Sequence, residues 1–83
     1  MTDEEIIQRL TPVFSSILKE PIVLETRKTA KDFKNWDSLN HINLMMAIEK
    51  QFKIRFTTKE IRDVADIGEL ILIIQRKSNL LAK

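Results

Sequence analysis

Residues that let a chain reverse direction are scarce in this sequence. Its 83 residues include one glycine, Gly68, and two prolines, Pro12 and Pro21. Hairpins depend on glycine for positive φ angles and on glycine or proline to end the strands, so a sheet of short strands would lack its turns. The length suits one domain and is too short for two. We therefore expect a single domain, residues 1–83, built from helices joined by ordered loops.

The first helix is predicted from Thr2 to about Lys19. Thr2 and Glu5 have the T-x-x-E spacing of a capping box, in which each side chain accepts a hydrogen bond from the other residue's backbone N–H. Apolar residues then recur at helical spacing, namely Ile6, Ile7, Leu10, Val13, Phe14, Ile17 and Leu18. Because Pro12 lacks an N–H, we expect a kink there, with Thr11 capping a second helical segment as the alternative.

A long loop and three further helices are predicted after it. Residues 21–36 show no sustained period, and Phe33 and Trp36 could pack this loop against the core. The helices that follow each begin at Asp, Ser or Thr, which are favoured N-caps. They span residues 37–52, 57–64 and 66–77. The expected fold is all-α: a small four-helix bundle with a long loop between helices one and two and a short third helix.

The predicted helix over residues 37–52 is apolar on two sides. One stripe should face the core, and it contains Leu44, Met45, Ile48 and Phe52. The opposite side presents Leu39, Asn43, Met46 and Lys50, with Ile42 at the edge between the two stripes. A helix in a small bundle needs only one buried face. The second stripe is therefore either a docking surface or a set of exposed apolar residues without a special role.

Composition restricts the location and chemistry of the protein. The sequence has no cysteine, which excludes disulfides and thiolate metal sites and favours a reducing compartment, so we expect a cytoplasmic protein. Acidic residues 3–5 stand where a signal peptide would be basic, and the longest apolar run, residues 70–74, is far too short to span a membrane. The net charge is +2, with the basic residues concentrated between positions 27 and 62.

Residues 36–52 read WDSLNHINLMMAIEKQF. This segment resembles the acyl carrier protein family, whose signature is Asp-Ser-Leu at the start of a helix that ends in a Glu-x-x-Phe-like sequence. The matching positions are Asp37-Ser38-Leu39 and Glu49-Lys50-Gln51-Phe52. The likeness continues through residues 54–56 and 66–70, and it covers about residues 2–77, nearly the whole chain.

The resemblance implies that Ser38 carries a covalent 4′-phosphopantetheine arm, which holds acyl groups as thioesters. The implied partners are a phosphopantetheinyl transferase, an acyl-loading ligase or acyltransferase, and downstream acyl-processing enzymes. Asp37 would support the transfer, and the residues that would contact partners are Leu39, Ile42, Asn43, Met46 and Lys50. Such a carrier is not an enzyme and needs no metal, and we expect a monomer. By themselves, Asp37 and Ser38 would indicate only helix capping.

Some positions depart from the family pattern. Typical members carry Asp and Glu along the second helix, whereas this chain has Asn40, Asn43 and Lys50 and retains only Glu49. Trp36 replaces the usual small residue before Asp-Ser, and in this it resembles carriers from secondary-metabolite or surface-polysaccharide pathways. Our hypothesis is a specialised carrier with its own cognate enzymes, rather than the housekeeping carrier of fatty-acid synthesis.

Two alternatives remain open on sequence grounds. A small helical nucleic-acid-binding domain would use the basic residues Lys50, Lys53, Arg55, Lys59 and Arg62. Its helix-turn-helix form needs a longer recognition helix than residues 57–64 can supply. An unmodified adaptor that docks partners through the second stripe is the other alternative. His41, the only histidine, is interpreted as a packed structural residue because it has no companion ligand at metal-binding spacing.

Overall fold

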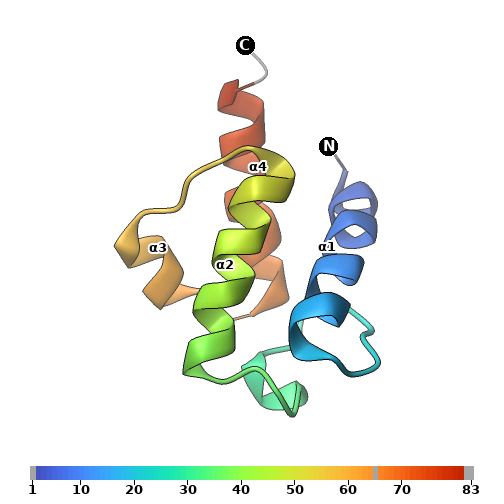
Figure 1. The fold of residues 1–83 in the computed structure, drawn as a ribbon. Coiled ribbons are helices and arrows are strands. Elements are labelled where there is room, and N and C mark those ends of the chain that lie inside the picture. The colour runs from blue at the N-terminus through green and yellow to red at the C-terminus, as the bar shows by residue number, and fades with distance from the viewer. Residues whose placement is uncertain (1, 65, 82–83) are drawn as a thin grey trace.

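The computed structural model describes residues 2–64 and 66–81, without side-chain detail for 79–81 (Figure 1). Its elements, in chain order, are α1 (Asp3–Leu18), the 3₁₀ turn η1 (Ala30–Asp32), α2 (Ser38–Phe52), α3 (Thr58–Asp63) and α4 (Ile67–Leu81). The described residues form no strand, apart from one isolated bridge between Thr29 and Asp66. The predicted all-α bundle, with its long loop and short third helix, is confirmed.

Helix α1 begins as the sequence indicates. The Thr2 hydroxyl accepts a hydrogen bond from the Glu5 N–H (3.2 Å), and the Glu5 carboxylate accepts one from the Thr2 N–H (3.0 Å). The hydrogen bond from the Thr2 N–H favours the ionised carboxylate and so lowers the pKa of Glu5. The helix then continues through Pro12 without a break, and the Thr11 hydroxyl donates to the carbonyl of Ile7 (2.8 Å). A second segment capped by Thr11 is therefore not formed.

The core lies between α1, α2 and α4. The predicted inner stripe of α2 is confirmed, since Leu44, Met45 and Ile48 are fully buried and Phe52 nearly so. The residues that α1 and α4 bury most completely are Ile6, Leu10, Phe14, Leu18, Ile67, Leu70, Ile71 and Ile74. The four α1 residues in this set all belong to the apolar series that helical spacing predicts for the first helix.

Aromatic side chains attach the long loop to the bundle. Phe33 and Trp36, both in the loop, are buried against Phe14 of α1. The Trp36 ring meets Phe14 edge-on, with 5.2 Å between ring centroids and 86° between planes. Phe33 lies 6.2 Å from Phe14 and 5.7 Å from Trp36. Such packing explains how a segment without regular structure stays ordered just before α2.

The single glycine lies where the backbone of the loop hydrogen-bonds to the start of α4. The Gly68 N–H donates to the Thr26 carbonyl (2.8 Å), and the Ile67 N–H donates to the Lys28 carbonyl (2.9 Å). A Cβ atom on Gly68 would lie 3.1 Å from the Thr26 carbonyl oxygen. Glycine therefore permits the two backbones to hydrogen-bond at this point.

Helix α4 is longer than predicted. The Asp66 carboxylate accepts from the Glu69 N–H (2.8 Å), as expected of a cap, but the helix continues to Leu81 instead of fraying at Lys77. The Lys77 ammonium lies 2.9 Å from the Glu60 carboxylate of α3, and no proline or glycine follows to end the helix. Within the part of the chain that the structure describes, no helix is long and apolar enough to cross a membrane.

Candidate functional site

The start of α2 leaves a hydroxyl and two amide donors free. Asp37 is the N-cap, and its carboxylate accepts from the Asn40 N–H (2.8 Å) while its carbonyl accepts from the His41 N–H (2.8 Å). Ser38, the first helical residue, is exposed. Among the described residues, no acceptor is recorded for the N–H of Ser38 or of Leu39. The helix dipole adds partial positive charge at the same point, so this end of α2 can bind an anion.

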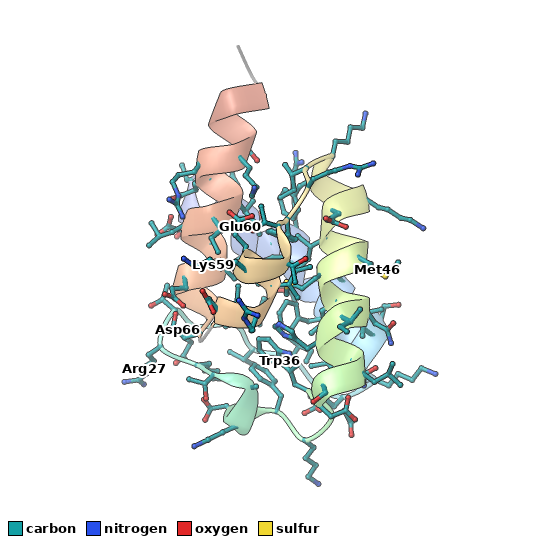
Figure 2. All side chains as sticks on the ribbon, turned by 90° about the vertical axis from the view of Figure 1, so that its left-hand side faces the viewer. Arg27, Trp36, Met46, Lys59, Glu60 and Asp66 are labelled. Carbon is teal, nitrogen blue, oxygen red and sulfur yellow. The ribbon has the colours of Figure 1, made fainter. Side chains whose placement is uncertain are left out.

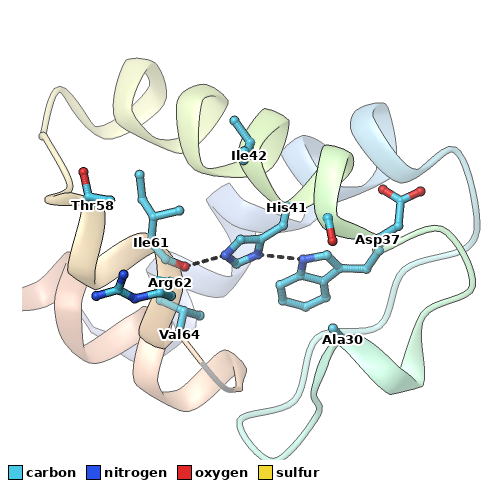
Figure 3. Close-up of a pocket in the computed structure, with 10 residues that line it drawn as sticks. Ala30, Asp37, His41, Ile42, Thr58, Ile61, Arg62 and Val64 are labelled. Carbon is cyan, nitrogen blue, oxygen red and sulfur yellow. Dashed lines mark hydrogen bonds between the residues drawn. The ribbon is translucent and has the colours of Figure 1, made fainter.

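A cavity of about 590 Å³ opens beside Ser38, between α2, α3 and the loop that contains η1 (Figure 3). Its apolar walls come from Ala30, Trp36, Ile42, Ile61 and Val64, and its polar lining from Asp37, Ser38, His41, Thr58 and Arg62. No pattern in the sequence predicted this cavity. It depends on how far α3 stands from α2, which no local pattern in either helix encodes.

One wall of the cavity is a hydrogen-bonded chain through His41. The Trp36 indole N–H donates to His41 Nδ1 (3.0 Å), so the proton of the neutral ring lies on Nε2. Nε2 then donates to the carbonyl of Ile61 in α3, at 2.6 Å (Figure 3). The indole and imidazole rings are nearly parallel, with centroids 5.9 Å apart. His41 therefore joins the loop, α2 and α3, in agreement with a structural role.

The structure brings the predicted docking residues together on the outer side of α2. Leu39 is 69% exposed, Ile42 51% and Met46 55%, and Asn43 and Lys50 are also exposed. Figure 2 shows Met46 pointing away from the bundle. Ile42, which the sequence places at the edge between the two stripes, is exposed and also lines the cavity beside Ser38.

The basic cluster of the nucleic-acid alternative is divided in space. Lys59 lies on the side of α3 toward α4, whereas Arg62 reaches the cavity wall (Figures 2 and 3). Helix α3 has only six residues, too few for a recognition helix that would enter a DNA groove. Neither the shape of α3 nor the placement of its cations supports that alternative.

The carboxylate of Glu60 holds α3 to α4. It accepts from the Thr57 N–H (2.8 Å), completing a capping box, and pairs with the Lys77 ammonium. Burial raises the pKa of Glu60, but the Thr57 N–H and Lys77 lower it by more, so the net pKa is below its ordinary value. The Glu60 carboxylate is therefore ionised at neutral pH, and it holds the helix that forms the far wall of the cavity.

Comparison with known proteins gives the family. No family model matches the chain. The acyl carrier protein of Prochlorococcus marinus is 30% identical over 82 residues, which cover 93% of this chain and 98% of that protein. The solution structure of holo acyl carrier protein from Geobacter metallireducens superposes with a TM-score of 0.84 and 31% identity, covering 92% of this chain and 88% of the other.

A second solved structure, the acyl carrier protein of Thermotoga maritima, has a TM-score of 0.83 over 95% of this chain and 93% of that chain. At 22% identity it supports the fold alone. The Prochlorococcus relative extends the likeness from fold to sequence over almost the full length of both chains. This chain therefore belongs to the acyl carrier protein family, whose members are carriers and not enzymes.

Proposed function

We propose that Ser38 carries a 4′-phosphopantetheine arm and that the protein presents acyl groups, held on that arm as thioesters, to partner enzymes. The observation that carries the proposal is an exposed Ser38 hydroxyl at the first position of α2, inside the Asp37-Ser38-Leu39 sequence typical of the family. A modifying enzyme needs access to this oxygen, and no side chain has to move to provide it.

The residues around Ser38 suit such an arm. The N–H groups of Ser38 and Leu39 and the dipole of α2 favour the negative charge of a phosphodiester. The cavity beside Ser38 offers apolar walls along which an organic arm can lie. When bound, the arm supplies a terminal thiol on which acyl groups form thioesters. Asp37 keeps the helix start ordered by its bond to Asn40 and, in this proposal, supports the transfer reaction.

Partner enzymes are proposed to dock on the outer face of α2. They comprise a phosphopantetheinyl transferase, an acyl-loading ligase or acyltransferase, and downstream acyl-processing enzymes. The contact residues would be Leu39, Ile42, Asn43, Met46 and Lys50, all exposed. Tethering raises the concentration of the acyl group at a docked enzyme to roughly millimolar levels, so weak and reversible docking is sufficient.

The pathway is proposed to be a specialised one. Asn40, Asn43 and Lys50 stand at positions that are acidic in typical carriers, which weakens attraction to the basic docking faces of fatty-acid synthesis enzymes. Residues 1–83 would act as one carrier domain, a monomer in the cytoplasm. The hypothesis fails if fatty-acid elongation enzymes use this protein as well as they use an acidic carrier.

Intact mass measurement tests the attachment. The chain is co-expressed with a broad-specificity phosphopantetheinyl transferase, as wild type, Ser38→Ala and Ser16→Ala. Ser16 is an exposed serine on α1 and provides the matched control. The wild type and Ser16→Ala should each gain one phosphopantetheine group, and Ser38→Ala none. A wild type that stays unmodified, or a Ser38→Ala protein that is modified, would refute the proposal.

A further inference from the structure

We propose that the outer face of α2, together with the basic residues at its C-terminal end, docks an acidic patch on the enzyme that loads or processes the carried acyl group. The docking surface consists of an apolar stripe, Leu39, Ile42 and Met46, and a basic rim, Lys50, Lys53 and Arg55. The inference rests on the proposed carrier function and specifies the chemistry of its partner. The acidic second helix of a typical carrier would instead select a partner with a basic surface.

The carboxylates near the rim are engaged inside the molecule. Glu49, beside Lys50 in the sequence, turns back to accept a hydrogen bond from the Phe56 N–H at 2.8 Å. Glu60 accepts from Thr57 and pairs with Lys77 of α4. Among the described residues, neither carboxylate forms an ion pair with a cation of the rim.

The cations of the rim all face solvent. In the segment after α2, Ile54 and Phe56 are 5% and 9% exposed, and this alternation turns Lys53 and Arg55 outward. Lys50 is exposed on the last turn of α2. Within residues 2–64 and 66–81, no carboxylate oxygen lies within 4.0 Å of any of these three cations. The helix dipole favours cations near its C-terminus, but Arg55 lies beyond the helix, and the dipole does not account for it.

Apolar surface flanks the rim on both sides. Met46 precedes Lys50 by one helical turn, and Leu39 and Ile42 extend the stripe toward Ser38. On the other side, a groove of about 370 Å³ between α1 and α2 is lined by Lys50 together with Val13, Ile17 and Ala47. A partner side chain that fills this groove would place its neighbours next to the ammonium of Lys50.

The basic rim and the apolar surface beside it together select an acidic protein surface. Complementary charge speeds encounter and fixes orientation, and buried apolar side chains provide most of the affinity. Nucleic acid would neutralise the rim but leave Leu39, Ile42 and Met46 uncovered. The expected partner face therefore combines Asp and Glu with apolar side chains.

Peptide titration tests this charge preference on the full chain. The probes are an amphipathic Leu/Glu peptide, its Leu/Lys counterpart, and a DNA duplex of mixed sequence. Binding is followed by the amide resonances of ¹⁵N-labelled protein. The double variant Lys50→Glu/Arg55→Glu is compared with Lys31→Glu/Lys34→Glu, a control that reverses two other exposed lysines and changes the net charge equally.

The Leu/Glu peptide should bind and shift resonances of residues 46–56, and the rim variant should weaken its affinity about tenfold, against less than about twofold for the control. The Leu/Lys peptide should not bind. Equal binding of the two peptides, equal weakening by the two variants, or tighter binding of the duplex than of the Leu/Glu peptide would overturn the inference. The mass of co-expressed wild type reports separately on Ser38, so failure of the carrier function is distinguishable from failure of this inference.

Discussion

Two adjacent methionines show the difference between the faces of α2. Met45 is fully buried, whereas Met46, the next residue, is 55% exposed. Met45 has Leu44 and Ile48 as buried companions, and Met46 shares the outer face with Leu39 and Ile42, which are more than half exposed. The two faces have similar side chains and the same helical backbone, but only the inner face is covered by the other helices.

Because of this difference, the inner face of α2 stabilises the fold, whereas the outer face remains free for contact with a partner. Full burial of a Met, Leu or Ile side chain stabilises a fold by about 1.5–3 kcal/mol, and the inner face of α2 provides several such contributions. The outer face provides little, because its apolar surface stays in water in the folded protein as it does in the unfolded chain. Under the proposed function, the outer face is useful only when a partner covers it.

Alanine substitution of the two methionines tests this difference, and it includes the greatest loss of stability that we expect. Met45→Ala should lower the free energy of unfolding by about 2–5 kcal/mol, because it removes buried contacts and leaves a cavity. Met46→Ala should change it by less than about 0.5 kcal/mol. Chemical denaturation of both variants measures these two changes in the free energy of unfolding. Similar losses for the two would show that the outer face also supports the fold.

A smaller effect is expected at the boundary between the faces, where His41 is half-buried. His41→Ala leaves the Trp36 indole N–H and the Ile61 carbonyl without their partner, and we expect a loss of about 1–3 kcal/mol. His41→Gln keeps a donor that can reach Ile61 and should lose less. Denaturation curves of the two variants give the two losses in the free energy of unfolding. Equal losses would mean that the hydrogen bond to α3 adds no stability.

The smallest effect on stability is expected for Met46→Glu, which should change the free energy of unfolding by less than about 0.5 kcal/mol. The same change should slow acyl loading of the phosphopantetheine-bearing protein by its cognate ligase, because it adds a charge to the apolar stripe. Leu72→Glu is the matched control, since Leu72 is 58% exposed and belongs to α4, which contributes no residue to the proposed docking surface. If both variants load at the wild-type rate, the outer face of α2 is not the docking site.

Most of the helix boundaries were predictable because they depend on near neighbours in the sequence. The T-x-x-E pairs at Thr2 and Thr57 form both of their reciprocal bonds, and Asp37 caps α2 at the expected residue. The end of α4 was predicted too early, at Lys77. Considered with its sequence neighbours alone, that lysine is typical of the last turn of a helix, but it pairs with Glu60 on another helix.

The candidate site was predictable only in part. The placement of Ser38 at the start of α2 and the outer stripe were predictable, because both depend on position within α2. Not predictable were the cavity beside Ser38, the bond from His41 to the Ile61 carbonyl, and the division of the basic residues among different surfaces. Each of these depends on the distance and orientation between α2 and α3, two helices connected by residues 53–57.

Local sequence is sufficient to predict the helices, their caps, the inner stripe of α2 and the position of the Asp-Ser-Leu motif. These features follow from hydrogen bonds and apolar spacing over three or four residues, distances that the chain covers without long-range contacts. Only the folded structure shows which carboxylates are engaged internally, which cations face solvent, and where a cavity opens beside Ser38. Those outcomes depend on packing between helices, because side chains distant in sequence compete there for the same space and the same partners.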